Sequence, residues 1–376
     1  MNAWVTIYAI GAAQALLLAL ALWWRTSNPQ ANRILAVWLG IVGVDLAVKA
    51  FYLAAPGTDR FPAYWFVGLF PFLYGSLFYL YVRALTTARG LQWRDVVHLG
   101  GFAFILSLST VQLARLPAGS WPSLGWWASS LMLVYSVSYV IAALVRIQRY
   151  RCGLLQRRSD ADRMSLRWIV AMAVGQIVIW VIAGAQQVLR IPHVDYFLIY
   201  GAVAAWVCVV GWFSLGQPPV TDGVAEQGSE APLGNTPNAA DTNNCVESDN
   251  GDALCDDTRF PAVEARLSQL MVSDALYREP ALTIGQVAKR SGYPEYLVSA
   301  VINRRLGGNF WEYINRHRID AATACFADVN DSRSILEIAY ACGFTSKSTF
   351  NAAFKRQVGQ TPSVYRRQQA SPAEGV

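Results

Sequence analysis

Around residue 350 the chain carries polar side chains at a spacing that places them on one face of a helix. Lys347, Ser348 and Asn351 fall in the first turns of this expected helix. A lysine ammonium group donates to guanine, and an asparagine amide pairs bidentately with adenine in the major groove. Lys355 and Arg356 follow one turn later and suit phosphate groups, which add affinity without sequence information. The expected chemistry is recognition of DNA.

A comparable set of side chains occurs about fifty residues earlier. Tyr296, Ser299 and Asn303 fall on the corresponding face of another expected helix. Arg304 and Arg305, at the end of that helix, are expected phosphate contacts. The chain therefore offers two separate faces with the same kind of chemistry.

Each polar face needs a short preceding helix and a tight turn to position it. In the first segment Thr283 is expected to cap a helix on which Val287 and Ala288 face inward, and Gly292 permits the turn that follows. A second helix is then expected over 296–304. This order is typical of a helix-turn-helix motif.

The same order recurs further along the chain. Gly343 takes the place of the earlier turn glycine, and Ser346 precedes the second recognition helix as a further expected DNA contact. The intervening stretch 310–326 reads as one connecting helix, with Phe310 and Ile314 buried. Two recognition helices on one connector can enter successive major grooves, which lie roughly 34 Å apart.

Three regions of the 376-residue chain differ in charge. Residues 1–216 hold 16 Lys/Arg and 6 Asp/Glu, residues 217–258 hold no Lys/Arg and 9 Asp/Glu, and residues 259–368 hold 15 and 9. The middle region is rich in Gly, Pro, Asn, Asp and Ser, so it cannot bury enough apolar surface to offset its chain entropy. We expect a flexible acidic linker over 217–258, a tandem helix-turn-helix domain over 259–368 and a disordered tail over 369–376.

The first region, 1–216, contains seven long apolar stretches. They cover 1–24, 34–55, 61–82, 96–114, 116–145, 168–189 and 196–220. Each is long enough to cross a hydrocarbon core of roughly 30 Å, which takes about 20 helical residues. We therefore expect an all-α protein in which a seven-helix transmembrane bundle, set in the lipid bilayer, precedes the linker and the C-terminal domain.

Arginine residues are distributed unevenly between the loops that join these stretches. Twelve fall in the loops after the first, third and fifth stretches, against three in the opposite loops. Because basic loops stay in the cytoplasm, we expect the N-terminus outside and the C-terminal domain inside.

One apolar stretch, 34–55, contains two ionisable residues, Asp45 and Lys49, which lie four residues apart on one face. Ionisable residues at membrane depth are costly and usually face a bundle interior or a cavity. Two interpretations stay open: a site for the signal or for a proton, or an internal ion pair with Lys49 reaching outward. Further candidates to line the same cavity are Pro71, Gln176, Gln186 and Gln187.

A set of residues near the C-terminal end carries a specific resemblance to a known family. The set consists of Glu337, Ile338, Ala339, Gly343, Phe344, Ser346, Phe350, Phe354, Lys355, Gly359, Thr361, Pro362, Tyr365 and Arg366. With these residues, 262–367 resembles the DNA-binding domain of AraC-family transcription regulators. The first region is similar, in architecture only, to the seven-helix region of membrane-embedded members of this family. Those members are transcription regulators located in the bacterial inner membrane. The resemblance implies promoter DNA as the partner.

The chain departs from the family pattern at Ala300 and Ala352, where the family often has arginine or another long polar residue. This departure weakens the expected direct readout of bases at both positions. A thymine methyl group is an alternative contact for Ala352.

No paired carboxylates, HExxH, GxSxG or phosphate-binding glycine loop occurs in a suitable context, so we expect no enzyme, no cofactor and no metal site. We expect a transcription regulator that couples a small-molecule or membrane signal to promoter binding. Whether it forms a homodimer stays open, as do the signal, the promoter and the sense of regulation. The alternatives are a transporter or a membrane scaffold with a regulatory helix-turn-helix tail.

Overall fold

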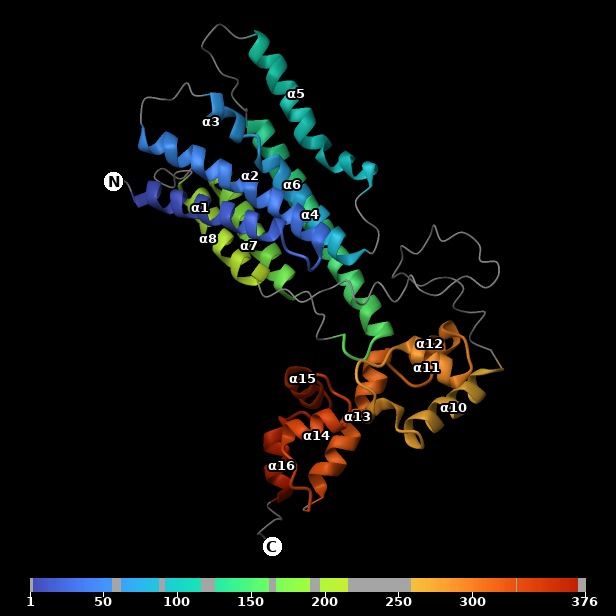
Figure 1. Cartoon of the computed structure of the whole chain (residues 1–376). Coiled ribbons are helices and arrows are strands. Elements are labelled where there is room, and N and C mark those ends of the chain that lie inside the picture. The colour runs from blue at the N-terminus through green and yellow to red at the C-terminus, as the bar shows by residue number, and fades with distance from the viewer. Residues whose placement is uncertain are drawn as a thin grey trace. The chain divides into compact units, whose positions relative to one another are not determined.

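The computed structural model describes residues 3–55, 62–87, 92–115, 126–161, 167–189, 197–215, 258–328 and 330–370. Within these ranges the secondary structure is helical, and the one β contact is an isolated antiparallel bridge between Arg158 and Thr283. This confirms the all-α fold class for the described ranges (Figure 1). The expected linker, apart from Thr258, and residues 371–376 of the expected tail lie outside them.

The chain divides into two compact units. The N-terminal unit comprises Met1–Gln148 and Leu166–Gly234, and the C-terminal unit comprises Arg149–Ser165 and Asn235–Val376. The division falls within one helix, so the C-terminal unit includes a segment that the sequence places between two apolar stretches of the first region.

The helices of the first region are apolar along most of their length. They are α1 (Ala3–Trp23), α2 (Pro29–Ala54), α3 (Pro62–Val67), α4 (Pro71–Thr86), the 3₁₀ helix η1 (Trp93–Leu99), α5 (Gly100–Arg115), α6 (Trp126–Arg157), α7 (Arg167–Leu189) and α8 (Phe197–Leu215). α2 packs against α1, α3, α4 and α8, and it is the most buried of the five described helices that are long and apolar enough to cross a membrane. It therefore forms the centre of the N-terminal unit.

Five helices in the described ranges are long and apolar enough to cross a membrane, judged by length and composition. They cover Ala3–Trp23, Pro29–Ala54, Trp93–Arg115, Trp127–Arg157 and Trp168–Gln186, and a shorter apolar helix covers Leu198–Ser214. Large apolar side chains also face outward, such as Leu17 and Trp212, which are 68% and 81% exposed. Extensive apolar exposure of this kind is typical of a surface that contacts lipid or another protein.

The stretch 61–82 forms two helices, so the expectation of one continuous helix was wrong here. α3 ends at Val67, and α4 begins at Pro71. Proline lacks the N–H that would donate to the carbonyl four residues earlier, and its ring clashes with that carbonyl. Pro71 therefore starts a new helix, because the first helical position tolerates proline.

The first motif of the C-terminal unit follows the predicted order. It consists of α10 (Phe260–Val272), the 3₁₀ helix η3 (Leu276–Arg278), α11 (Ile284–Ser291) and α12 (Glu295–Arg304). The Thr283 hydroxyl caps α11 by accepting from the Gln286 N–H at 3.3 Å, and the Gln286 side chain accepts from the Thr283 N–H at 2.8 Å. Gly292 has a φ of 78°, in the left-handed region that the turn requires.

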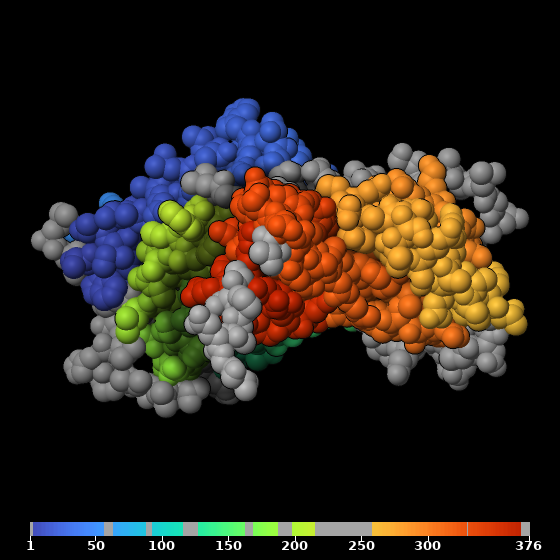
Figure 2. Space-filling view, turned by 90° about the horizontal axis from the view of Figure 1, so that it is seen from below, coloured from blue at the N-terminus to red at the C-terminus, as the bar shows by residue number. Residues whose placement is uncertain are grey.

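The second motif repeats this arrangement. α13 (Phe310–Ala327) connects the two motifs and is followed by α14 (Ile335–Ala341), α15 (Lys347–Val358) and α16 (Pro362–Ala370). The core of the second motif contains Phe326, Phe344, Phe350 and Phe354, whose rings pack edge-to-face or tilted. Figure 2 shows the two motifs as adjacent lobes, the first in yellow-orange and the second in red.

Candidate functional site

The first recognition helix, α12, is held in the domain by its apolar face. Leu297, Val298 and Ile302 are buried in the core that α10 and α11 also build. Tyr296 and Asn303 lie on the opposite face and are exposed. This face is therefore accessible, and its contact with DNA stays a prediction.

The polar residues at the end of α12 have partners within the domain. Asn303 Nδ2 donates to Ser299 Oγ at 3.4 Å, and Arg305 Nε lies 2.9 Å from Glu264 Oε2 in an ion pair. Arg304 is exposed. Exposed ion pairs contribute only about 0–1 kcal/mol, so Arg305 can exchange Glu264 for a phosphate group at small cost.

The second recognition helix, α15, begins with a serine cap. Ser346 Oγ accepts from the Thr349 N–H at 3.2 Å and also lies 3.1 Å from Ser348 Oγ. Ser346 thus caps the N-terminus of α15, a role that was not predicted from the sequence. Its contact with DNA stays a prediction. Lys347 and Ser348 are exposed directly after it, and Asn351 is half-buried one turn later.

The basic residues at the end of α15 differ in their surroundings. Lys355 is exposed. Arg356 forms an ion pair with Glu312, and its guanidinium lies 5.4 Å from the centroid of the Trp311 ring. A cation over an indole face is stabilised by the ring quadrupole. Arg356 is therefore fastened to α13 by two contacts, which makes Lys355 the more available phosphate contact of the pair.

A buried arginine of α13, Arg318, was missed by sequence reasoning. It is 1% exposed, and it donates through Nε to the Tyr277 carbonyl at 2.7 Å and through Nη2 to the Glu279 carbonyl at 2.8 Å. Burial lowers the pKa of Arg318 to about 10, which leaves the guanidinium charged at neutral pH. Its spacing of four residues from Ile314 and from Ala322, both buried, was a signal for an inward side chain.

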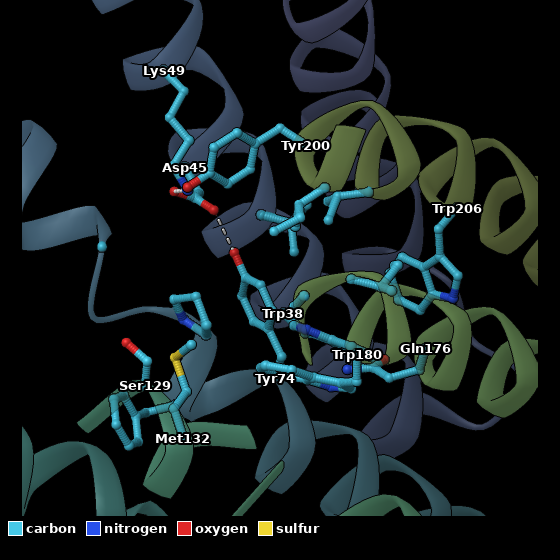
Figure 3. Close-up of a pocket in the computed structure, with 18 of the residues that line it drawn as sticks. Trp38, Asp45, Lys49, Tyr74, Ser129, Met132, Gln176, Trp180, Tyr200 and Trp206 are labelled. Atoms are coloured by element: carbon cyan, nitrogen blue, oxygen red, sulfur yellow. Dashed lines mark hydrogen bonds and ion pairs between the residues drawn. The ribbon is translucent and has the colours of Figure 1, made fainter. Parts of the chain in front are cut away.

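The N-terminal unit contains a cavity of about 260 Å³, lined by side chains of α2, α4, α6, α7 and α8 (Figure 3). Asp45 and Lys49 both line it, and so do Pro71 and Gln176, as the sequence predicted. Gln186 does not line it, so that expectation was wrong, and the side chain of Gln187 lies outside the described part of the chain. The cavity is therefore the place where the ionisable residues of the bundle meet polar groups from other helices.

The two ionisable residues form an internal pair. Asp45 Oδ1 lies 2.5 Å from Lys49 Nζ, and the Tyr74 hydroxyl donates to Asp45 Oδ2 at 2.7 Å. Lys49 Nζ also lies 3.7 Å from the centroid of the Tyr200 ring. The Lys49 side chain is 4% exposed, so it does not reach outward. The internal ion pair is thus present, although Lys49 does not reach outward, and the pair faces a cavity. A role of the pair as a signal or proton site stays a prediction.

Two tryptophans of the cavity wall carry indole N–H groups without a hydrogen-bond partner in the described structure. They are Trp38 and Trp180, which are 1% and 5% exposed. By contrast, Trp206 Nε1 donates to the Met172 carbonyl at 3.1 Å. An unsatisfied buried donor costs about 1–3 kcal/mol, so both indoles favour an acceptor atom in the cavity. Figure 3 shows them beside Gln176, away from the ion pair.

Comparison with known proteins shows what the C-terminal part of the chain is similar to. Residues 287–368 match a family model described as a helix-turn-helix domain. The chain is 33% identical over 85 residues to the regulatory protein SoxS of Escherichia coli, covering 23% of this chain and 78% of SoxS. It is 32% identical over 95 residues to the transcriptional regulator Rob of Salmonella typhimurium, covering 25% of this chain and 32% of Rob. No solved structure matches the chain.

The melibiose operon regulatory protein of Escherichia coli is 32% identical over 101 residues, which cover 27% of this chain and 33% of that protein. The chain thus spans about a third of the length of this relative and of Rob. Tandem helix-turn-helix motifs with outward polar faces define a DNA-binding protein. Through this domain the chain belongs to the AraC family of transcription regulators. Its relatives are regulators and not enzymes.

Proposed function

We propose that this chain is a membrane-embedded transcription regulator that couples a signal at the membrane to binding of promoter DNA. One observation carries the proposal: a single chain joins long apolar helices to a tandem helix-turn-helix domain of the AraC family. The bundle would comprise seven crossings, with α3 and α4 together forming the third and α8 the last. A flexible acidic linker over 217–258 would then connect the bundle to the domain.

The distribution of arginines supports an orientation with the N-terminus outside and the DNA-binding domain in the cytoplasm of a bacterial cell. Twelve of them fall in the loops assigned to the cytoplasm and three in the opposite loops. Cytoplasmic loops retain Lys and Arg during insertion. This orientation brings the C-terminal domain to the compartment that contains the DNA.

The recognition helices α12 and α15 would enter successive major grooves. Base contacts are assigned to Tyr296, Ser299, Asn303, Ser346, Lys347, Ser348 and Asn351, and phosphate contacts to Arg304, Arg305, Lys355 and Arg356. Asn351 and Lys347 carry most of the expected base discrimination, because amide and ammonium groups match adenine and guanine edges.

The cavity of the N-terminal unit is the proposed signal site, and its chemistry limits the ligand class. An apolar cavity of about 150 Å³ accommodates benzene, so 260 Å³ holds a single ring with a few substituents or a short branched chain. The indole N–H groups of Trp38 and Trp180 select a molecule with acceptor oxygens at one end. A group that displaces Lys49 from Asp45 at the other end would change the ion pair. We therefore propose a small, largely apolar carbonyl compound.

Replacing the ion pair tests this assignment. In the double variant Asp45→Asn with Lys49→Met, we expect the chain to insert at normal abundance and to bind DNA, but reporter output to be fixed at one level across growth conditions. The reason is that a ligand shifts a regulator only through its differential affinity for two states of the bundle. Promoter activity is measured across conditions together with membrane abundance.

Val44→Ala is the matched control, because Val44 lies next to Asp45 but is 45% exposed on the outer face of α2. This variant should respond normally. Normal inducibility of the double variant at normal abundance would reduce the ion pair to a structural role and leave the signal site elsewhere. Substrate uptake that depends on the ion pair would instead favour the alternative of a transporter with a regulatory tail.

A further inference from the structure

One segment of the first region is part of the C-terminal unit. Residues 149–161 include the last turns of α6, which ends at Arg157, and the short turn after it. In the sequence they lie between the fifth and sixth apolar stretches, in the most arginine-rich loop. We call residues 149–161 the clasp segment.

The clasp segment joins the first motif through its backbone. Arg158 forms the antiparallel bridge with Thr283, the residue that caps α11. The Ser159 N–H donates to the Leu282 carbonyl at 3.0 Å. Ser159 is completely buried. The clasp segment is therefore held to the first motif by backbone hydrogen bonding at a buried position, whereas an incidental surface contact would involve only exposed side chains.

The same serine contacts the helix that connects the two motifs. Asn315 Nδ2 donates to the Ser159 carbonyl at 3.3 Å, and Arg318 Nη2 donates to Ser159 Oγ at 3.2 Å. Arg318 also holds the Tyr277 and Glu279 carbonyls of the first motif. The clasp segment therefore completes the hydrogen bonding of a buried charged group at the centre of the domain.

Apolar contacts extend the clasp segment onto the second motif. Ala161 is 6% exposed and belongs to the core that includes Ile319, Ala339 and Phe354, and Leu154 and Leu155 pack against the same core. Asp160 is 5% exposed and is neutralised by Arg158 at 2.9 Å. One short segment thus touches the first motif, the connector and the second motif.

We infer that the clasp segment is the docking element through which the membrane bundle controls the relative arrangement of the two helix-turn-helix motifs. This inference rests on the proposed function. The contacts given above use none of the side chains assigned to DNA, so within the described residues the docked segment leaves both recognition faces accessible. Because α6 continues from the bundle into the clasp segment, a change of the bundle that moves this helix acts on both motifs together.

The comparison with SoxS concerns the role of the clasp segment in the helix-turn-helix domain. The match covers 78% of SoxS, so the domain makes up most of that regulator. A domain of this kind can thus make up most of a regulatory protein, which fits a regulatory role for the clasp segment. Loss of docking should therefore remove coupling and leave DNA binding.

Hydrogen exchange of the full-length chain in lipid nanodiscs tests the docking. We expect the Ser159 amide to exchange at least about ten-fold more slowly than in the variant Ala161→Asp, which places a carboxylate in the apolar core of the second motif. Gln156→Asp is the matched control, because Gln156 is exposed on the same part of α6, and it should leave the protection intact. Equal, fast exchange of Ser159 in the wild-type chain and in Ala161→Asp would overturn the inference.

A cycle of variants tests the coupling without a ligand. The affinity of the full-length chain for a DNA site selected with the wild-type chain is compared with and without Asp45→Asn/Lys49→Met. We expect these bundle substitutions to change the affinity about five-fold or more in the presence of an intact clasp and less than about two-fold with Ala161→Asp.

The two proposals fail differently in this cycle. An equal affinity change with and without the intact clasp would overturn the inference and leave the signal site standing. If the bundle substitutions leave the DNA affinity unchanged both with and without Ala161→Asp, Asp45 and Lys49 are not the signal site. The hydrogen exchange of the Ser159 amide then decides whether the clasp segment docks. Ala161→Asp alone should keep sequence-specific binding, and its loss in a correctly folded chain would contradict a coupling role.

Discussion

Gly343→Ala is expected to destabilise the C-terminal domain by about 2–5 kcal/mol. Gly343 has a φ of 91°, which disfavours any residue with a Cβ atom. A methyl group there would lie 2.7 Å from the carbonyl oxygens of both Tyr277 and Arg278. These oxygens belong to the backbone of η3, so the clash cannot be relieved by a side-chain rotation. Gly343 is where the second motif packs against the first.

Gly292→Ala is the matched control for this prediction. Gly292 holds the same place in the first motif and has a φ of 78°, but no atom lies within 4 Å of the added methyl group. Only the backbone cost of about 1–2 kcal/mol remains. Hydrogen exchange of the buried amides of the C-terminal domain in the full-length chain, which reports the free energy of opening, measures both. Equal losses for the two variants would show that the contact with η3 does not constrain the second motif.

Asn351→Ala is expected to weaken binding of the cognate DNA site by about 1–3 kcal/mol, roughly 5- to 150-fold, and to relax the preference at one base pair. The amide is held half-buried on α15, between the buried Phe350 and the exposed Ala352. It is therefore pre-positioned to pair with an adenine edge. Titration of the full-length chain with the site and with single-base variants of the site measures the effect.

Lys355→Ala is the control for direct base readout. Its exposed ammonium group suits a phosphate contact, so the substitution should weaken all sequences alike and lower the salt slope by about 1. Comparison at two salt concentrations separates the two kinds of loss. If both substitutions leave the affinity unchanged, the recognition face assigned to α15 is wrong.

The helix-turn-helix domain could be predicted because its signals are local. Thr283 and Gln286 are close enough in sequence to cap the same helix end. Gly292 and Gly343 mark turns with a positive φ, which glycine adopts without strain. The apolar spacing of Val263 and Leu267 in α10 likewise indicates which face of that helix is buried.

Contacts between distant residues could not be predicted in this way. Ser159 and Arg318 are 159 positions apart, and neither spacing nor composition connects them. The roles of Ser346 as a cap and of Arg356 as a partner of Trp311 likewise depend on the packed structure. Pro71 was present in the sequence, but the stretch 61–82 was predicted as one helix because it is apolar throughout. The break that proline imposes on a helix was not taken into account.

The cavity was predictable only in part. Asp45 and Lys49 were recognisable because ionisable residues are rare in apolar helices. Their partners Tyr74 and Tyr200 come from other helices, and the unsatisfied indole of Trp38 is apparent only once the helices are packed. Composition therefore located the site, and three-dimensional packing defined its chemistry.

The most direct test of the central claim is sequencing of the DNA that co-purifies with the chain in floated membranes after crosslinking of intact cells. We expect discrete genomic sites to be enriched in the membrane fraction with the wild-type chain. The enrichment should be lost with Asn351→Ala combined with Lys355→Ala at equal chain abundance. A chain found only in the soluble fraction, or membrane DNA that is the same for both chains, would contradict a membrane-embedded regulator that binds promoter DNA.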